Sequence, residues 1–276
     1  MRGSDHSEGA NPPPRIQAIC LDIDDTLVDF STSARRALVG MIGRDDMWPT
    51  WQRMTDEHVA KVVAGELDAD AMRMARTKAF FADLGAKLDD ELIRELENRR
   101  RTEMCKTWQL FDDVVACLNW LRAAGLKLAA VTNASSSHQR VKLGDLGITR
   151  FFDTVVIAGE LGAAKPDPVI FHTACARLKV PPSEALHVGD RLDTDARGAR
   201  DAGLHGVWLD RGGAHPPVEP TLQVIYTLAD LPGLLVREYL TPATIGPSGV
   251  PGQRAPDPVS GPRGRWSTIS GRHHGQ

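Results

Sequence analysis

Long apolar runs, closely spaced cysteines and a strong charge imbalance are all missing from this 276-residue chain. No stretch approaches the length of a membrane span, and the N-terminus lacks the apolar core of a signal peptide. The four cysteines lie far apart, without the paired spacing of a metal site, and the net charge of -3 provides no basic surface. We therefore expect a cytoplasmic protein with reduced thiols and with neither a nucleic-acid nor a membrane partner.

Two terminal segments also lack the apolar periodicity of a packed core. Residues 1–15 are polar and contain consecutive prolines, and residues 239–276 are rich in glycine, proline, serine and arginine. Such compositions bury too little apolar surface to offset the entropy lost when a chain becomes ordered. We expect both segments to be disordered, and the remainder to form one large core with an insertion.

Residues 31–109 show helical spacing of apolar residues and no strand pattern. Asp68 and Asp89 each stand where a helix N-cap is expected, and each follows a leucine that can pack one turn into the helix. Two earlier stretches of this segment also have helical spacing. Four helices without a strand predict a small helical domain that interrupts the rest of the chain.

Strand and helix patterns alternate through the other residues, 16–30 and 110–238. Asp167, followed by a proline, is a strong signal for the start of a helix. Repeated strand–helix units predict the fold class α/β, with a doubly wound parallel-sheet core and helices on both faces. The apolar runs that predict its strands lie near residues 16–21, 126–131, 152–158, 185–188 and 206–209.

Four carboxylates directly follow the first predicted strand: Asp22, Asp24, Asp25 and Asp29. Strand geometry places Asp22 and Asp24 on one side, about 7 Å apart, which leaves room for a small tetrahedral group. Carboxylates crowded against an apolar sheet lose hydration and repel one another, and a divalent cation would relieve both costs. A solvated turn that caps a helix explains this cluster equally well, and Asp25 and Asp29 are best interpreted as such turn or cap residues.

Polar side chains also follow the later predicted strands: Thr132, Lys165, and Asp190 with Asp193 and Asp195. The carboxyl ends of parallel strands face one edge of a sheet, so these groups can converge with the first cluster despite their separation in sequence. Taken singly, a threonine at a strand end or a lysine in a loop indicates nothing. Together they would supply a nucleophile, a hydroxyl donor, a cation and an acidic metal site, which is what phosphoryl transfer requires.

At these residues the sequence resembles the haloacid dehalogenase (HAD) superfamily. Asp22-Ile-Asp-Asp-Thr26, Thr132, Lys165-Pro-Asp-Pro and Gly189-Asp-Arg-Leu-Asp-Thr-Asp195 match its four motifs in order, and the resemblance covers about Ile16 to Trp208. The inserted segment resembles the C1-type helical cap of the phosphatase branch. The resemblance implies a Rossmann-like core and a Mg²⁺-dependent phosphatase that hydrolyses a small phosphorylated metabolite through an aspartyl-phosphate.

The same resemblance implies roles for the residues that react with the ester. Asp22 would be the nucleophile that forms the aspartyl-phosphate. Asp24 would protonate the leaving oxygen and then take a proton from the water that hydrolyses the intermediate. Thr132 and the main-chain N–H of Asn133 would bind phosphoryl oxygens, and Lys165 would offset negative charge on the nucleophile and the phosphoryl group.

A metal site is implied as well. Mg²⁺ would be held by the carboxylates of Asp22 and Asp190 and by the main-chain carbonyl of Asp24, because it prefers oxygen ligands. Asp195 would support the metal-bound waters or Lys165. Asp193 has no assigned role beyond capping the following helix.

Four other functions compete with the phosphatase. A phosphomutase shares all the motifs, and only the cap decides where the phosphoryl group goes next. A 2-haloacid dehalogenase needs neither an acid nor a metal, so Asp24 and the acidic group around Asp190 argue against it. A receiver-type signalling domain lacks an inserted helical bundle. A catalytically silent HAD-like binding protein would be expected to have lost a motif. The natural substrate and the oligomeric state stay open.

Overall fold

The protein is described here from a computed structural model, in residues 13–134, 136–213, 219 and 222–242. Within these residues, six strands form one sheet in the order β3-β2-β1-β4-β5-β6, and every neighbouring pair is parallel. The chain extends the sheet from β1 in one direction through β2 and β3, and in the other through β4, β5 and β6. The predicted α/β class with a doubly wound parallel sheet is confirmed. The strands are β1 Ala18–Leu21, β2 Lys127–Thr132, β3 Thr154–Ile157, β4 Ala185–Gly189, β5 His205–Leu209 and β6 Gln223–Ile225.

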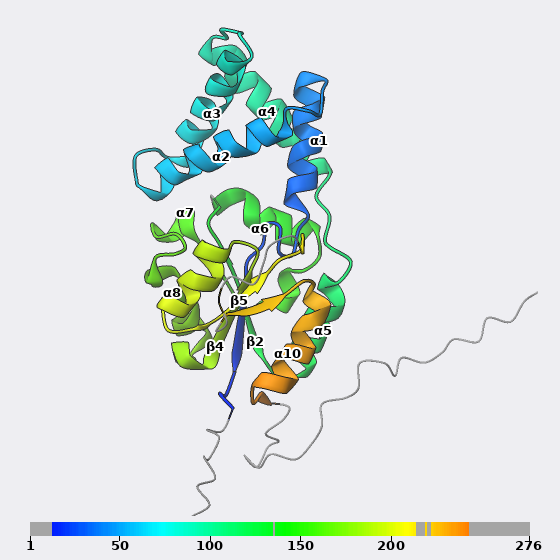
Figure 1. The fold of residues 1–276 in the computed structure, drawn as a ribbon, viewed down its shortest axis with the longest axis vertical. Helices are drawn as coiled ribbons and strands as arrows, with labels where there is room; N and C mark the ends of the chain where they lie inside the picture. The colour runs from blue at the N-terminus through cyan, green and yellow to red at the C-terminus, as the bar shows by residue number, and fades with distance from the viewer. Residues whose placement is uncertain (1–12, 135, 214–218, 220–221, 243–276) are drawn as a thin grey trace, which may run out of the picture.

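Helices cover both faces of this sheet (Figure 1). Ile19 and Leu21 of β1 belong to the apolar core on one face, and Ala18 and Cys20 belong to the core on the other. Since both faces are covered, β1 is apolar throughout rather than alternating. The first face packs against α5 (Val114–Ala123) and α10 (Leu231–Glu238), and the second against α8 (Pro168–Leu178) and α9 (Gly198–Asp201).

Four helices are inserted between β1 and α5, and they stand above the sheet in Figure 1. Asp68 and Asp89 are N-caps as predicted, because their carboxylates accept hydrogen bonds from main-chain N–H groups of the first turn. Trp51 and Phe80 pack edge to face at the centre of this domain, with ring centroids 5.0 Å apart. The helices are α1 Phe30–Ile42, α2 Trp48–Val63, α3 Ala69–Asp83 and α4 Asp90–Lys106.

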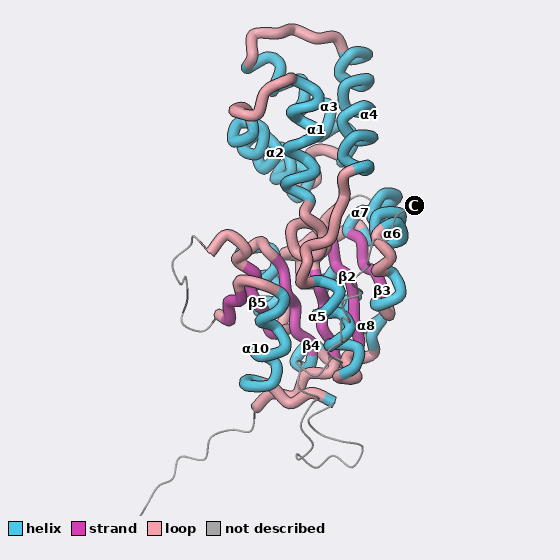
Figure 2. The backbone as a smooth tube through the Cα atoms, turned by 90° about the vertical axis from the view of Figure 1, so that its right-hand side faces the viewer, coloured by secondary structure: helices cyan, strands magenta, loops and turns pink. Residues whose placement is uncertain are grey.

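Two linkers, residues 22–29 and 107–113, join the helical domain to the sheet and run beside each other (Figure 2). The N–H of Asp29 donates to the carbonyl of Gln109 at 2.9 Å, and that of Phe111 donates to the carbonyl of Leu27 at 3.1 Å. The predicted limits of this domain, 31–109, stay a prediction, and α1 itself begins one residue earlier. Within the described part of the chain, no helix combines the length and apolarity that crossing a bilayer requires.

The structure corrects the expected ends of the ordered core. Arg15 pairs with Leu240 as a parallel bridge, and the N–H of Leu240 donates to the carbonyl of Pro14 at 2.9 Å. Tyr239 and Thr241 are buried. The segments predicted to be disordered therefore extend too far into the ordered core at both ends. Composition is an average over a whole segment, so it does not reveal a few ordered residues at the edge of that segment. Residues 1–12 and 243–276 lie outside the described residues.

Candidate active site

The carboxyl ends of the strands face the helical domain (Figure 1), and the polar residues predicted at strand ends belong to this edge of the sheet. The chain passes from the carboxyl end of β1 to the start of α1 through residues 22–29. The carboxyl end of β1 is therefore joined directly to the helical domain by this linker. The N–H of Asp22 donates to the carbonyl of Val188 in β4 at 3.0 Å, while the preceding Leu21 lies opposite Ala130 in β2. Asp22 therefore stands between the ends of β2 and β4, where Thr132 is the last residue of β2 and Asp190 directly follows β4.

Lys165 places its ammonium among three acceptors. Its Nζ contacts Oδ1 of Asp22, lies 2.6 Å from Oδ1 of Asp195 and donates to the carbonyl of Val131 at 3.1 Å. Burial alone would lower the pKa of Lys165, but the attraction of Asp195 and Asp22 outweighs burial and raises this pKa. The side chain is 3% exposed, so it provides a fixed positive charge beside Asp22.

Asp22, Asp190 and Asp195 form an acidic cluster in which one carboxylate oxygen from each lies within 4.8 Å of the others. Burial, then repulsion by Asp22 and Asp195, raises the pKa of Asp190 to about 8. Burial also raises the pKa of Asp22 to about 7, although Lys165 opposes this. Burial would do the same to Asp195, but Lys165 and His187 lower its pKa. Burial and mutual repulsion thus disfavour the ionised forms of Asp22 and Asp190, and a hard divalent cation such as Mg²⁺, which binds carboxylate oxygens, would offset that repulsion.

Thr132 and Asn133 flank this cluster at the end of β2. Oγ1 of Thr132 is buried and accepts from the N–H of Ala134 at 3.3 Å. The side-chain amide of Asn133 donates to the carbonyl of Lys165 at 2.8 Å and accepts from its N–H at 2.7 Å. Asn133 thus clamps the backbone of Lys165, a contact that the sequence did not predict. Phosphate binding by Thr132 and by the main-chain N–H of Asn133 stays a prediction.

The side chain of Asp24 turns towards α6 (Ser136–Asp145). Its Oδ2 accepts from Nε2 of Gln139 at 2.8 Å, and its Oδ1 contacts Nζ of Lys142. Sequence analysis assigned a role to neither residue. Their i, i+3 spacing places both on one face of a predicted helix, but this signal does not identify a partner 115 positions away in the chain.

The remaining residues of the first motif hold the loop between β1 and α1. Asp25 accepts from the N–H of Ser31 at 2.8 Å and from its hydroxyl at 2.7 Å. Asp29 is the N-cap of α1. Both residues are the turn and cap residues that were predicted. Thr26, which received no role from the sequence, is buried and directs its hydroxyl to Oδ1 of Asp190 at 3.4 Å.

Asp195 is held from several sides. Nε2 of His187 lies 2.9 Å from its Oδ1, and the N–H of Arg191 donates to its Oδ2 at 3.0 Å. A Cβ on Gly189 would lie 2.3 Å from Cγ of Asp195, so only glycine fits there. With its ion pair to Lys165, Asp195 has the contacts of a residue that supports that lysine, one of the two functions expected of it.

Two residues near this site point outward. The guanidinium of Arg191 lies 3.3 Å from Oδ1 of Asp56 in α2, and both side chains are 60% exposed. This pair links the core to the helical domain but contributes little energy at such exposure. Asp193 pairs with Arg197 one turn along and is 79% exposed, which makes it a surface ion pair.

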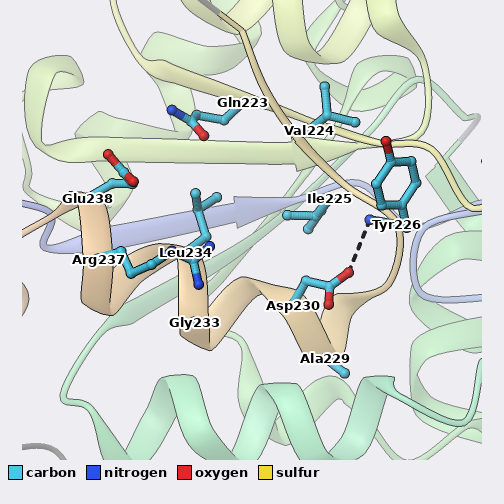
Figure 3. A pocket seen from close by; sticks show the side chains of 10 residues that line it. All are labelled: Gln223, Val224, Ile225, Tyr226, Ala229, Asp230, Gly233, Leu234, Arg237 and Glu238. Carbon is cyan, nitrogen blue, oxygen red and sulfur yellow. Dashed lines mark hydrogen bonds between the residues drawn. The ribbon is translucent and has the colours of Figure 1, made fainter. Parts of the chain in front are cut away.

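A pocket of about 400 Å³ lies away from these residues, between β6 and α10. Figure 3 shows its lining, in which the N–H of Tyr226 donates to Oδ2 of Asp230 at 3.2 Å. None of the predicted site residues contributes to it. β6 itself was not predicted, because three residues are too few to show a period of two.

Comparison with known proteins identifies the family. Residues 16–203 match the model of the haloacid dehalogenase-like hydrolases, and the chain belongs to this family. A crystal structure of the putative HAD-hydrolase YfnB from Bacillus subtilis, bound to magnesium, is 25% identical with a TM-score of 0.69. The superposition covers 80% of this chain and 99% of that one.

Two curated relatives cover most of this chain and carry phosphatase names. The glyceraldehyde 3-phosphate phosphatase of Methanopyrus kandleri is 50% identical over 71% of this chain and 85% of its own length. The N-acylneuraminate-9-phosphatase of Mus musculus is 30% identical over 80% of this chain and 94% of its own. The predicted class of enzyme, a hydrolase of phosphate monoesters, is confirmed.

Proposed function

We propose that this chain is a Mg²⁺-dependent phosphatase that hydrolyses a small phosphorylated metabolite through an aspartyl-phosphate on Asp22. The carboxylate of Asp22 carries the proposal. It is buried at the carboxyl end of the central strand, contacts the ammonium of Lys165, and lies within 4.8 Å of oxygen atoms of Asp190 and Asp195. A nucleophile, a fixed positive charge and a set of oxygen donors thus occupy one point at the sheet edge.

The proposed reaction has two steps. An oxygen of Asp22 forms a bond to phosphorus as the bond to the ester oxygen breaks, and Asp24 gives its proton to the departing alcohol. Asp24, now a carboxylate, takes a proton from a water whose oxygen attacks phosphorus. The bond between phosphorus and Asp22 then breaks, which releases inorganic phosphate and restores both carboxyl groups.

The other residues hold and neutralise the phosphoryl group. Lys165 offers its charge beside the carboxylate of Asp22, and Asn133 fixes the backbone from which that lysine projects. Thr132 would donate its hydroxyl to a phosphoryl oxygen. Mg²⁺, when held by Asp22, Asp190 and the carbonyl of Asp24, would supply positive charge that offsets the negative charge of the transferring phosphoryl group.

The substrate class is proposed from the relatives. Their names specify phosphate esters of small polar metabolites, a triose phosphate in one case and an acylneuraminate in the other. We infer a substrate of the same kind for this chain, in a cytoplasmic location. Phosphate release from a panel of sugar, triose, glycolate and nucleotide monophosphates tests this. Hydrolysis of nucleotides alone would contradict it.

Removal of divalent metal is expected to abolish hydrolysis reversibly. In a chelator, the carboxylates of Asp22 and Asp190 would repel each other and the phosphate dianion, and only the single charge of Lys165 would oppose this repulsion. The measurement is the rate of p-nitrophenyl phosphate hydrolysis before chelation, after it, and after Mg²⁺ is restored. An undiminished rate in the chelator would exclude the metal from the proposed reaction.

Replacing Asp24 by asparagine is expected to slow hydrolysis most for esters whose leaving group needs a proton. General acid–base catalysis contributes about 10²- to 10⁴-fold, so alkyl phosphates should lose that much in kcat/KM. Nitrophenyl phosphate, whose leaving group needs little protonation, should lose much less. If both kinds of ester lose the same factor, Asp24 is not the acid.

A further inference from the structure

Lys142 is a buried lysine that the reaction as proposed does not use. Its side chain is 2% exposed, and its ammonium contacts Oδ1 of Asp24, whose own side chain is 24% exposed. A buried ammonium is costly unless it is paired, so this charge has a specific partner in the Asp24 carboxylate. Gln139, one turn earlier on α6, donates to the other oxygen of the same carboxylate at 2.8 Å.

Two aromatic rings also lie near this ammonium. Nζ of Lys142 lies 5.1 Å from the ring centroid of Phe30 and 4.9 Å from that of Trp108. These distances are within the range of cation–π attraction. Phe30 is the first residue of α1, and Trp108 follows α4, which ends at Lys106. One ring therefore lies at each of the two points where a linker meets the helical domain.

We propose that Lys142 is a positioning residue, which sets the orientation of the Asp24 carboxylate and ties that orientation to both linkers of the helical domain. This inference rests on the proposed function of Asp24 as the acid–base group. Both oxygens of Asp24 contact side chains of α6, so the position of that helix sets the direction of the carboxylate. A shift of either linker would displace a ring that holds Lys142, and Asp24 with it.

The test compares kcat/KM for a series of phosphate monoesters whose leaving groups range from nitrophenol to a simple alcohol. K142M keeps the length of the side chain and removes its charge, and K142R restores a charge. K127M is the matched control, because Lys127 is a half-buried lysine that donates to the carbonyl of Leu178 at 2.7 Å at the opposite end of β2. D24N and the double variant D24N/K142M complete a cycle.

K142M is expected to lose about tenfold in kcat/KM on the alkyl ester but less than about threefold on the nitrophenyl ester, since a displaced acid affects poor leaving groups most. K142R should recover part of this loss, and K127M should match the wild type. In the D24N background, K142M should cost nothing further, because it acts through Asp24. If K142M does not fold, W108L carries the same test, since it removes one ring and leaves the ion pair.

Three outcomes would overturn the inference. Equal losses on every ester would make Lys142 a structural residue only, and a full further loss in the D24N background would mean that it acts by another route. A faster K142M would show that the pair restrains Asp24. Failure of the proposed function is distinguishable, because in that case D24N itself would show no preference between leaving groups.

Discussion

Replacing Asp22 by asparagine is expected to reduce phosphate-ester hydrolysis by about 10⁴-fold or more, because an amide oxygen is too weak a nucleophile to form the acyl-phosphate. Asparagine has the same shape and keeps an oxygen that can accept from Lys165. Folding should therefore be retained. Since the substitution also removes one charge from a crowded acidic cluster, thermal unfolding in a chelator should occur at the same temperature or a higher one.

The control for this experiment is D193N. Asp193 also belongs to the motif after β4, but it pairs with Arg197 at the surface and is 79% exposed. Its loss should leave both the rate and the unfolding temperature near those of the wild type. Covalent labelling distinguishes the variants further. Brief incubation with a ³²P-labelled ester, followed by quenching, should trap labelled phosphate on the wild type but not on D22N. Substantial turnover by D22N would exclude the aspartyl-phosphate.

The parts of the fold that the sequence predicted are those determined by local pattern. The apolar run of β1 indicated a strand covered on both faces, and Asp68, Asp89 and Asp167 indicated helix starts that the structure shows as N-caps. Such signals depend on residues only a few positions apart. The parallel sheet then followed from their alternation.

The features that sequence analysis missed depend on contacts between distant segments. The pair Lys142–Asp24 joins residues 118 positions apart, and a lysine on a helix is ordinarily solvated. Asn133 was assigned a main-chain role, whereas the structure shows its side chain clamping Lys165, 32 positions away. His187 belongs to none of the motifs, and only the fold shows that it contacts Asp195. No spacing rule within one segment indicates these partners.

The convergence of the site residues at one sheet edge could be predicted from the sequence only in part. The topology of a parallel sheet predicts that strand ends share one edge, but it does not predict which oxygen faces which charge. In the structure, Lys165 is shared between Asp22 and Asp195, so one lysine serves two carboxylates. The residue that follows β3 in sequence thereby contacts groups that follow β1 and β4. Because two buried carboxylates share Lys165, loss of this lysine should reduce stability strongly.

Replacing Lys165 by methionine is expected to destabilise the protein by about 3–5 kcal/mol, because it leaves buried carboxylates without their counter-charge. Asp195 has a side chain only 1% exposed, and that of Asp22 is 9% exposed, so water cannot take the place of the ammonium. Activity should also fall to background. Denaturant unfolding of the chelated protein measures the first effect, and phosphate release measures the second.

The double variant K165M/D195N separates charge from packing. If the destabilisation comes from unpaired carboxylates, removing one of them should return a large part of the lost free energy of unfolding, while activity stays absent. K127M, which removes a half-buried lysine with a carbonyl partner, should cost only about 0.5–1.5 kcal/mol. Equal losses in K165M and K127M would mean that Lys165 contributes packing alone, and its pairing with Asp22 and Asp195 would then have no energetic weight.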